Sequence, residues 1–223
     1  MLYVIATPIG NLQDITFRAI ETLKAVDKIY CEDTRRTRQL LDHYGITKPT
    51  ESYHHHSDYK IPSIVRELKD GQSLAYVSDA GTPGLSDPAG KLVAAAREAG
   101  IQVSPLPGAS AITSLLSVAG VYANEFRFAG YAPTKKGRQT FLRSILNEDV
   151  PVVFFETAPR FLKLLNELTS LDAESRRLVV GRELTKQFEE IVSETVTELK
   201  DRFTAQAPRG EFVLVLTPPS KRA

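Results

Sequence analysis

The chain has 223 residues, of which 42% are hydrophobic and 25% are charged, as is typical of a folded globular protein and not of a disordered one. The net charge of +1 does not by itself require a polyanionic partner, and the single cysteine, Cys31, excludes an internal disulfide. No apolar run reaches the roughly 20 residues of a membrane span, and the start lacks the basic leader of a secretory signal. We therefore expect a cytoplasmic protein with no membrane partner.

Short β-rich runs alternate with helical periodicity along the first half of the chain. Asp14 can cap a first helix whose apolar residues Phe17, Ile20 and Leu23 share one face. This alternation predicts βαβ units and a mostly parallel sheet, in which ligands bind beyond the carboxyl ends of the strands. Strands are expected at 2–5, 28–31, 74–77 and 101–106, and further helices at 38–43, 62–68, 91–99 and 111–119.

The second half predicts another α/β domain. Residues 121–124 are the best boundary, which gives an N-terminal α/β domain over 1–120 and a C-terminal α/β domain over 121–223. Strands are expected at 126–129, 152–155, 178–181, 190–194 and 212–216, and helices at 139–146, 161–168 and 196–203.

Glycine and proline concentrate directly after three of the predicted strands, in the segments 6–11, 78–88 and 107–111. Small residues let a ligand approach the backbone, and prolines fix the shape of a loop. Three such loops at one sheet edge would line a common crevice; the alternative is that each is only a tight turn.

The loops do not match the common phosphate-binding motifs. No G-x-G-x-x-G follows the first strand and no G-x-x-x-x-G-K-[ST] occurs, which disfavours a dinucleotide-binding protein and a P-loop NTPase. A crevice of small residues with Asp79 but without a phosphate cradle suits a ligand that carries a ribose, an amine or a sulfonium.

Six blocks occur in order along the chain: Ala6–Leu12, Glu32–Arg35, Ser78–Gly84, Pro107–Gly108, Phe155–Arg160 and Arg182–Lys186. Over almost the whole chain, this ordered set resembles the small-subunit ribosomal RNA methyltransferase I family, within the tetrapyrrole methylase superfamily. The resemblance implies two α/β domains of the tetrapyrrole methylase type, with S-adenosylmethionine (SAM) in the cleft between them, and a homodimer. It also implies a methyl acceptor, the 2′-hydroxyl of a cytidine ribose in the decoding region of 16S rRNA of the small ribosomal subunit.

The resemblance also carries a set of cofactor-binding positions over to this chain. They are Pro8, Ala80, Gly81, Thr82, Leu85, Ser110, Ala111, Phe155, Glu156, Leu184 and Gly210.

A ribose hydroxyl is a poor nucleophile at neutral pH, so a carboxylate that accepts its proton would assist methyl transfer. The candidates for this catalytic role are Asp33, Asp79 and Glu183. Each has a structural alternative: Asp33 as a helix cap, Asp79 as a tie to loop amides, and Glu183 as a partner of a neighbouring cation.

Two basic clusters are candidates for RNA binding: Arg35, Arg36 and Arg38, and then Lys135, Lys136 and Arg138. The second follows Tyr131, whose ring could stack on a base. A solvated helix face is the alternative for either cluster. Adjacent histidines at 54–56 fan apart on any regular element, so no metal site is expected there.

Two other functions remain open from the sequence. One is a small-molecule, tetrapyrrole-like methylase on the same scaffold. The other is a non-catalytic module that binds RNA or a nucleotide. The Glu32–Arg35 and Ser78–Gly84 blocks favour the RNA methyltransferase over the small-molecule enzyme by resemblance.

Overall fold

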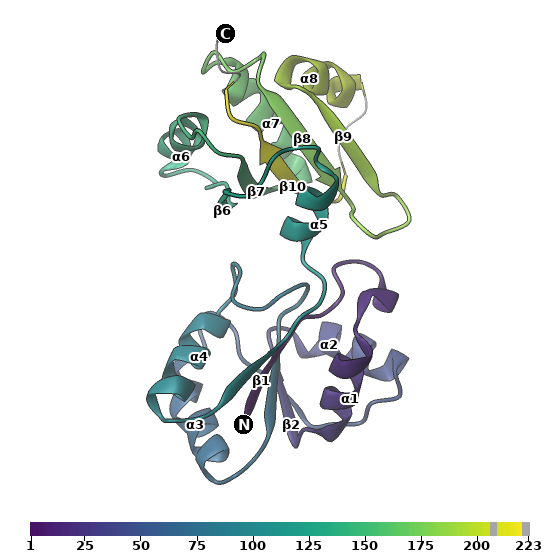
Figure 1. Cartoon of the computed structure of the whole chain (residues 1–223), viewed down its shortest axis with the longest axis vertical. Coiled ribbons are helices and arrows are strands. Elements are labelled where there is room, and N and C mark those ends of the chain that lie inside the picture. Colours follow the sequence, from purple (N-terminus) through teal and green to yellow (C-terminus); the bar gives the residue numbers. More distant parts are fainter. Residues whose placement is uncertain (206–208, 220–223) are drawn as a thin grey trace. The chain divides into compact units, whose positions relative to one another are not determined.

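A computed structural model describes residues 1–205 and 209–219 of the chain (Figure 1). The chain divides into two compact units, Met1–Ser110 and a second that begins at Ala111. This division lies ten residues before the boundary placed at 120/121 from the sequence. The reason is that helix α5 (Ala111–Val118) packs on strand β10 (Glu211–Leu216) of the second unit.

The first unit contains a five-stranded sheet in which every neighbouring pair is parallel, as the alternating pattern predicts. Strand β3 was not predicted, because three half-buried residues give too short a pattern to recognise. In order across the sheet, the strands are β3 (Thr50–Ser52), β2 (Lys28–Cys31), β4 (Leu74–Val77), β1 (Leu2–Ile5) and β5 (Val103–Leu106).

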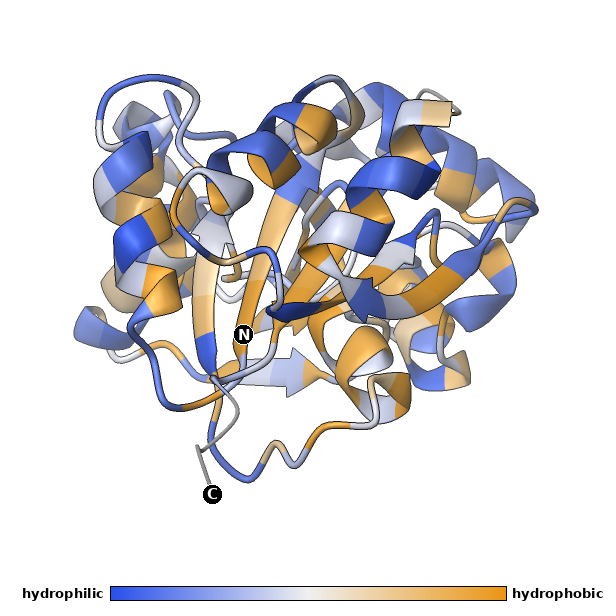
Figure 2. Ribbon diagram, turned by 90° about the horizontal axis from the view of Figure 1, so that it is seen from above, coloured by the Kyte–Doolittle hydropathy of each residue, from blue (hydrophilic) through white to orange (hydrophobic). Residues whose placement is uncertain are grey.

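Helices cover both faces of this sheet. One core cluster takes Leu23 from α1 (Phe17–Ala25) and Leu41 from α2 (Thr34–His43). The other takes Ile64 from α3 (Ile61–Lys69) and Leu92 from α4 (Ala89–Glu98). In Figure 2 the strands are largely hydrophobic, whereas the helices carry both hydrophobic and hydrophilic residues. Two 3₁₀ helices, Leu12–Asp14 and Asp58–Lys60, complete the unit.

The start of α1 differs from the prediction. Thr16, not Asp14, is the N-cap, and its hydroxyl accepts a hydrogen bond from the backbone N–H of Ala19 at 3.1 Å. Asp14 lies in the preceding 3₁₀ helix. Of the predicted face, Leu23 is buried and Ile20 is partly buried, but Phe17 is 88% exposed, and the helix buries Ala19 in addition.

The second unit contains a mixed sheet in the order β6-β7-β10-β8-β9, in which only β6 and β7 are parallel. Its remaining strands are β6 (Arg127–Tyr131), β7 (Val152–Thr157), β8 (Arg177–Arg182) and β9 (Glu190–Thr195). Its remaining helices are α6 (Arg138–Leu146), α7 (Ala158–Thr169) and α8 (Val196–Ala205).

An aromatic cluster joins α7, α8 and β10 in the core of the second unit. The ring of Phe161 stacks on Phe212 with 4.4 Å between centroids, and the edge of Phe203 packs against Phe161. Such pairs stabilise by about 0.5–1.5 kcal/mol beyond the burial of their area. Within the described ranges, none of the helices combines the length and the hydrophobicity needed to cross a bilayer.

Candidate active site

All five strands of the first sheet end in one row. Ile5 of β1 pairs with Val77 of β4 and Leu106 of β5, while Cys31 of β2 pairs with Val77 and with Ser52 of β3. Because the strands are parallel and end in register, the segments that follow them emerge at the same edge of the sheet. The three glycine- and proline-rich loops predicted from the sequence are therefore neighbours.

Backbone and hydroxyl hydrogen bonds connect these loops. Thr7 and Gly81 exchange two backbone hydrogen bonds, of 3.0 and 2.9 Å, and the Thr7 hydroxyl donates to the carbonyl of Ser78 at 3.2 Å. The Thr82 hydroxyl donates to the carbonyl of Ala109 at 3.1 Å, which joins the second loop to the third. The three loops thus form one connected surface made largely of backbone.

Two glycines make this close packing possible. A Cβ at Gly108 would lie 2.9 Å from the Cβ of Ala6, closer than two such atoms can approach. A Cβ at Gly81 would lie 3.3 Å from Ile9, and the φ of Gly81 is +79°, which favours glycine. The predicted cofactor-binding residues of the first unit lie on these loops: Pro8, Ala80, Gly81, Thr82, Leu85 and Ser110. Ala111 follows at the start of α5.

Three carboxylates flank the loops at the ends of β2 and β4. The backbone N–H of Asp79 donates to Oε2 of Glu32, and the backbone N–H of Asp33 donates to Oδ1 of Asp79, each at 3.0 Å. The guanidinium of Arg36 lies 3.7 Å from the other oxygen of Asp79. Two of the predicted catalytic candidates, Asp33 and Asp79, are thus brought together, with Glu32 as a third carboxylate.

The surroundings of Asp33 lower its pKa, whereas those of Glu32 raise its pKa. Asp33 caps α2, and hydrogen bonds from the side chain and backbone of Arg35 lower the pKa of Asp33 to about 2. Burial raises the pKa of Glu32, although the hydrogen bond from Asp79 opposes this effect. A proton acceptor works best when its pKa is near the working pH, so Glu32 suits that role better than Asp33. Glu32 is not among the carboxylates predicted from the sequence, in which its position directly after β2 is its only signal.

The second unit gathers its predicted residues at one edge as well. Thr157 at the end of β7 pairs with Glu211 at the start of β10, and Arg182 at the end of β8 pairs with Phe212. Four predicted cofactor-binding positions lie at or next to this edge: Phe155, Glu156, Leu184 and Gly210. The carboxylate of Glu156 is completely buried and paired with arginines, so it is not available to a ligand.

The side chain of Glu183 connects the segment after β8 to the start of β10 at this edge. Its Oε1 accepts hydrogen bonds from Lys186 Nζ and from the backbone N–H of Glu211, each at 2.9 Å. Burial alone would raise the pKa of Glu183, but these two hydrogen bonds lower it. A Cβ at Gly210 would lie 2.5 Å from the Glu183 side chain. Glu183 therefore has the contacts of a structural tie, which is the alternative stated for it above.

The predicted basic clusters differ in exposure. Arg35, Arg36 and Arg38 are exposed on α2, and Lys135 and Lys136 are exposed on the loop before α6. Arg138 departs from the prediction of a surface contact: it is 3% exposed, because its guanidinium pairs with Glu156 and Glu167 inside the second unit. Tyr131, whose ring was expected to stack on a base, is 56% exposed.

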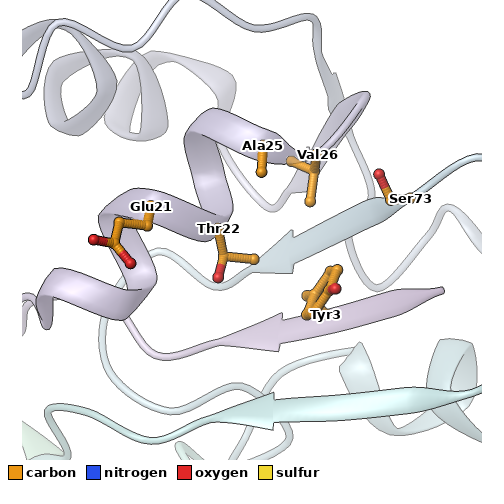
Figure 3. A pocket seen from close by; sticks show the side chains of 6 residues that line it. All are labelled: Tyr3, Glu21, Thr22, Ala25, Val26 and Ser73. Atoms are coloured by element: carbon orange, nitrogen blue, oxygen red, sulfur yellow. The ribbon is translucent and has the colours of Figure 1, made fainter.

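Neither the histidines nor the pocket in Figure 3 adds a competing site. His54, His55 and His56 are exposed, and within residues 1–205 and 209–219 no group of three or more suitable side chains could hold a metal ion.

A small pocket of about 230 Å³ lies at the amino ends of β1 and β4, away from the loops (Figure 3). It is lined by Tyr3, Glu21, Thr22, Ala25, Val26 and Ser73. The connected loops described above lie at the opposite, carboxyl ends of these strands.

Comparison with known proteins identifies the family to which this fold belongs. The model of the tetrapyrrole (corrin/porphyrin) methylases matches residues 1–200. Among solved structures, diphthine synthase has a TM-score of 0.74 at 15% identity and covers 98% of this chain and 90% of its own. Uroporphyrin-III-C-methyltransferase from Thermus thermophilus has a TM-score of 0.67 at 15% identity and covers 96% and 93%. At such identities the two structures show a shared fold, that of the tetrapyrrole methylases.

Relatives with higher sequence identity show to which group of methylases the chain belongs. The ribosomal RNA small subunit methyltransferase I of Synechocystis sp. is 44% identical over 97% of this chain and 78% of its own length. The protein of the same name from Neisseria meningitidis serogroup B is 46% identical over 97% and 76%. The chain belongs to the tetrapyrrole methylase family and, within it, to the ribosomal RNA small subunit methyltransferase I family. It is accordingly a methyltransferase that uses SAM as its methyl donor.

Proposed function

We propose that this chain transfers a methyl group from SAM to the 2′-hydroxyl of a cytidine ribose in the decoding region of 16S rRNA. The observation that carries the proposal is the identity of 44–46% to proteins named ribosomal RNA small subunit methyltransferase I, over 97% of this chain. The in-register loops of the first unit support it, because they supply a site for the donor.

The loop surface fits the chemistry of SAM. Small residues leave backbone amides and carbonyls open to an adenosine, and Ala80 and Leu85 are exposed on the second loop. Glu32 and Asp79 beside the loops can accept hydrogen bonds from ribose hydroxyls and attract a cation. When bound, SAM supplies an electrophilic methyl group on a sulfonium. Connected loops hold the donor rigidly, and positioning of this kind can lower the barrier by about 7–11 kcal/mol.

The carboxylates beside the loops can accept the proton of the ribose hydroxyl. Among the candidates, Asp79 lies against the loop surface, while Asp33 is committed to Arg35 and Glu183 to Lys186. Glu32 adds a second acceptor with a raised pKa. We propose that the Glu32 and Asp79 pair takes up the proton, a role that contributes about 10²–10⁴-fold to the rate.

The exposed basic side chains at 35, 36, 38, 135 and 136 are the proposed contacts to the RNA backbone. Lys135 and Lys136 are near Tyr131, which offers a face for a base. A homodimer and a small-subunit substrate in the cytoplasm complete the proposal; these three features rest on the family.

The test is transfer of label from tritiated SAM to purified small ribosomal subunits that lack the modification, followed by identification of the labelled nucleoside. We expect label in a 2′-O-methylcytidine. Label in a small molecule instead would support a tetrapyrrole-like methylase, and no label with SAM still bound would support a non-catalytic binding module. Either outcome would overturn the proposal.

Single-turnover transfer then tests the proton acceptor. We expect Glu32→Gln and Asp79→Asn to slow transfer at saturating SAM, while Asp33→Asn and Glu183→Gln remain close to the wild-type rate. If all four variants bind SAM and keep the wild-type rate, no carboxylate at these edges accepts the proton.

A further inference from the structure

The second unit contains a buried ion-pair network around Glu156. Oε2 of Glu156 lies 2.9 Å from Nη1 of Arg138, and Oε1 lies 2.7 Å from Nη2 of Arg160. Nε of Arg138 also donates to Glu167 at 2.6 Å. The carboxylate of Glu156 is completely buried, and the side chains of Arg138 and Arg160 are 3% and 21% exposed.

Both arginines also hold the backbone of one loop. Nη1 of Arg138 donates to the carbonyl of Pro133 at 2.9 Å. Nη1 of Arg160 donates to the carbonyl of Ala132 and to the hydroxyl of Thr134, each at 3.3 Å. Three consecutive residues of the loop are therefore bound by side chains that Glu156 orients. Charge-assisted hydrogen bonds of this kind are stronger than neutral ones.

This loop, residues 132–137, presents Lys135 and Lys136 to solvent. It starts at the end of β6, where the strand register shifts before Tyr131, and ends at Gly137, whose φ is +82°. The backbone N–H of Ala132 still donates to the carbonyl of Phe155 in β7 at 3.1 Å, at the start of the loop. Beyond that point, the carbonyl of Pro133 and the hydroxyl of Thr134 are held by the two arginines.

We propose that Glu156 is a positioning residue for substrate RNA: through Arg138 and Arg160 it fixes the loop 132–137, so that Lys135 and Lys136 meet the RNA backbone as a preformed pair. This inference rests on the proposed function, and it gives Glu156 a role distinct from the cofactor contact that the family resemblance implies. An ordered loop binds with a smaller loss of conformational entropy than a mobile one.

Arg160→Ala is the variant of choice, because Arg160 is partly exposed and its loss leaves the Arg138 pair to Glu156 in place. We expect its KM for the small ribosomal subunit to rise roughly fivefold, with kcat and the Kd for SAM unchanged. Arg160→Lys should recover part of the loss, since it keeps the charge. The matched control is Lys163→Ala on the same helix, which removes an exposed cation whose ion-pair partner, at 3.9 Å, is Glu167 and leaves the arginine hydrogen bonds to the loop in place. It should leave KM unchanged.

Two further readouts separate this inference from the proposed function. Trypsin should cut after Lys135 or Lys136 faster in Arg160→Ala than in the wild type, whatever the substrate is. In a Lys135→Ala/Lys136→Ala background, Arg160→Ala should cause no further rise in KM. Unchanged trypsin cleavage, or a full additional rise in KM in that background, would overturn the positioning role. Faster cleavage with no RNA methylation in any variant would instead remove the proposed function and leave the anchored loop.

Discussion

The two sheet edges that carry the predicted site residues are built in different ways. In the first unit the loops are joined by backbone and hydroxyl hydrogen bonds between small residues, such as Thr7 to Gly81 and Thr82 to Ala109. In the second unit the edge is held by long charged side chains, such as Glu156 with Arg138 and Glu183 with Lys186. A surface made of backbone suits a small cofactor, whereas a charged frame suits the presentation of cations to a polyanion.

The largest effect should come from breaking the charged frame. We expect Glu156→Gln to lower the free energy of unfolding by about 3 kcal/mol, because it removes one of the two carboxylates that pair with the buried Arg138 and leaves only Glu167. Arg36→Ala is the contrast in the first unit: its guanidinium is 60% exposed and 3.7 Å from Asp79, so its loss should cost less than about 1 kcal/mol. Urea unfolding of both variants measures the difference, and equal losses would show that burial does not distinguish the two edges.

The next effect concerns the backbone surface of the first unit. Gly108→Ala places a Cβ 2.9 Å from the Cβ of Ala6, so the third loop must move. We expect the affinity for SAM to fall roughly tenfold, since displacement of about 1 Å is enough to disturb a rigid site. Isothermal titration calorimetry gives the affinity.

Gly90→Ala in α4 is the matched control for Gly108→Ala. A Cβ at Gly90 meets nothing within 4 Å, and the residue is helical. SAM affinity should be unchanged and stability should rise by about 0.5–1 kcal/mol. If both alanines weaken SAM binding equally, the close contact at Gly108 is not what shapes the site.

The charged edge should also control the salt dependence of RNA binding. Replacing Lys135 and Lys136 with alanine should reduce the slope of log K against log salt by about 1.4, or about 0.7 for each lost phosphate contact to single-stranded RNA. Binding measured from low to moderate salt gives this slope. A slope equal to that of the wild type would place both lysines outside the interface.

The smallest expected effect distinguishes a cap from a catalyst at Asp33. Asp33→Ala should lower Tm by roughly 2–4 °C through the lost N-cap. Asparagine caps as well as aspartate and loses only the exposed ion pair with Arg35, so it should shift Tm by less than about 1 °C. The pKa of Asp33 is lowered from 3.8 to about 2, so its ion pair stabilises the fold above about pH 3.8. That contribution is lost as the pH falls through about 2. Thermal unfolding at several pH values checks both points, and a loss of transfer activity in the asparagine variant at unchanged Tm would restore Asp33 as a catalyst.

Local sequence patterns predicted much of the fold. Strands 2–5, 28–31 and 74–77 have the predicted bounds, because short apolar runs flanked by glycine and polar residues specify them. The three loops of the first unit were predicted from the glycines and prolines that follow its strands. Helix α2 starts at Thr34, earlier than the predicted 38, because its first turn is polar and arginine-rich and has no apolar period to reveal it.

Long-range pairing could not be predicted in the same way. Arg138 and Glu156 are 18 positions apart, and the sequence around Arg138 is that of a solvated basic cluster. Only the packing of α6 against β7 and α7 turns this arginine inward. Glu32 was missed for a related reason: its burial, which raises its pKa, depends on the neighbouring strand β4 and the loop after it.

Amide hydrogen exchange of the full chain, with and without saturating SAM, tests the central claim most directly. We expect SAM to slow exchange in the segments 78–85 and 107–110 and at Thr7, with no change around the pocket at Tyr3, Glu21 and Ser73. Protection at that pocket, or no protection in the loops while SAM is bound, would contradict it.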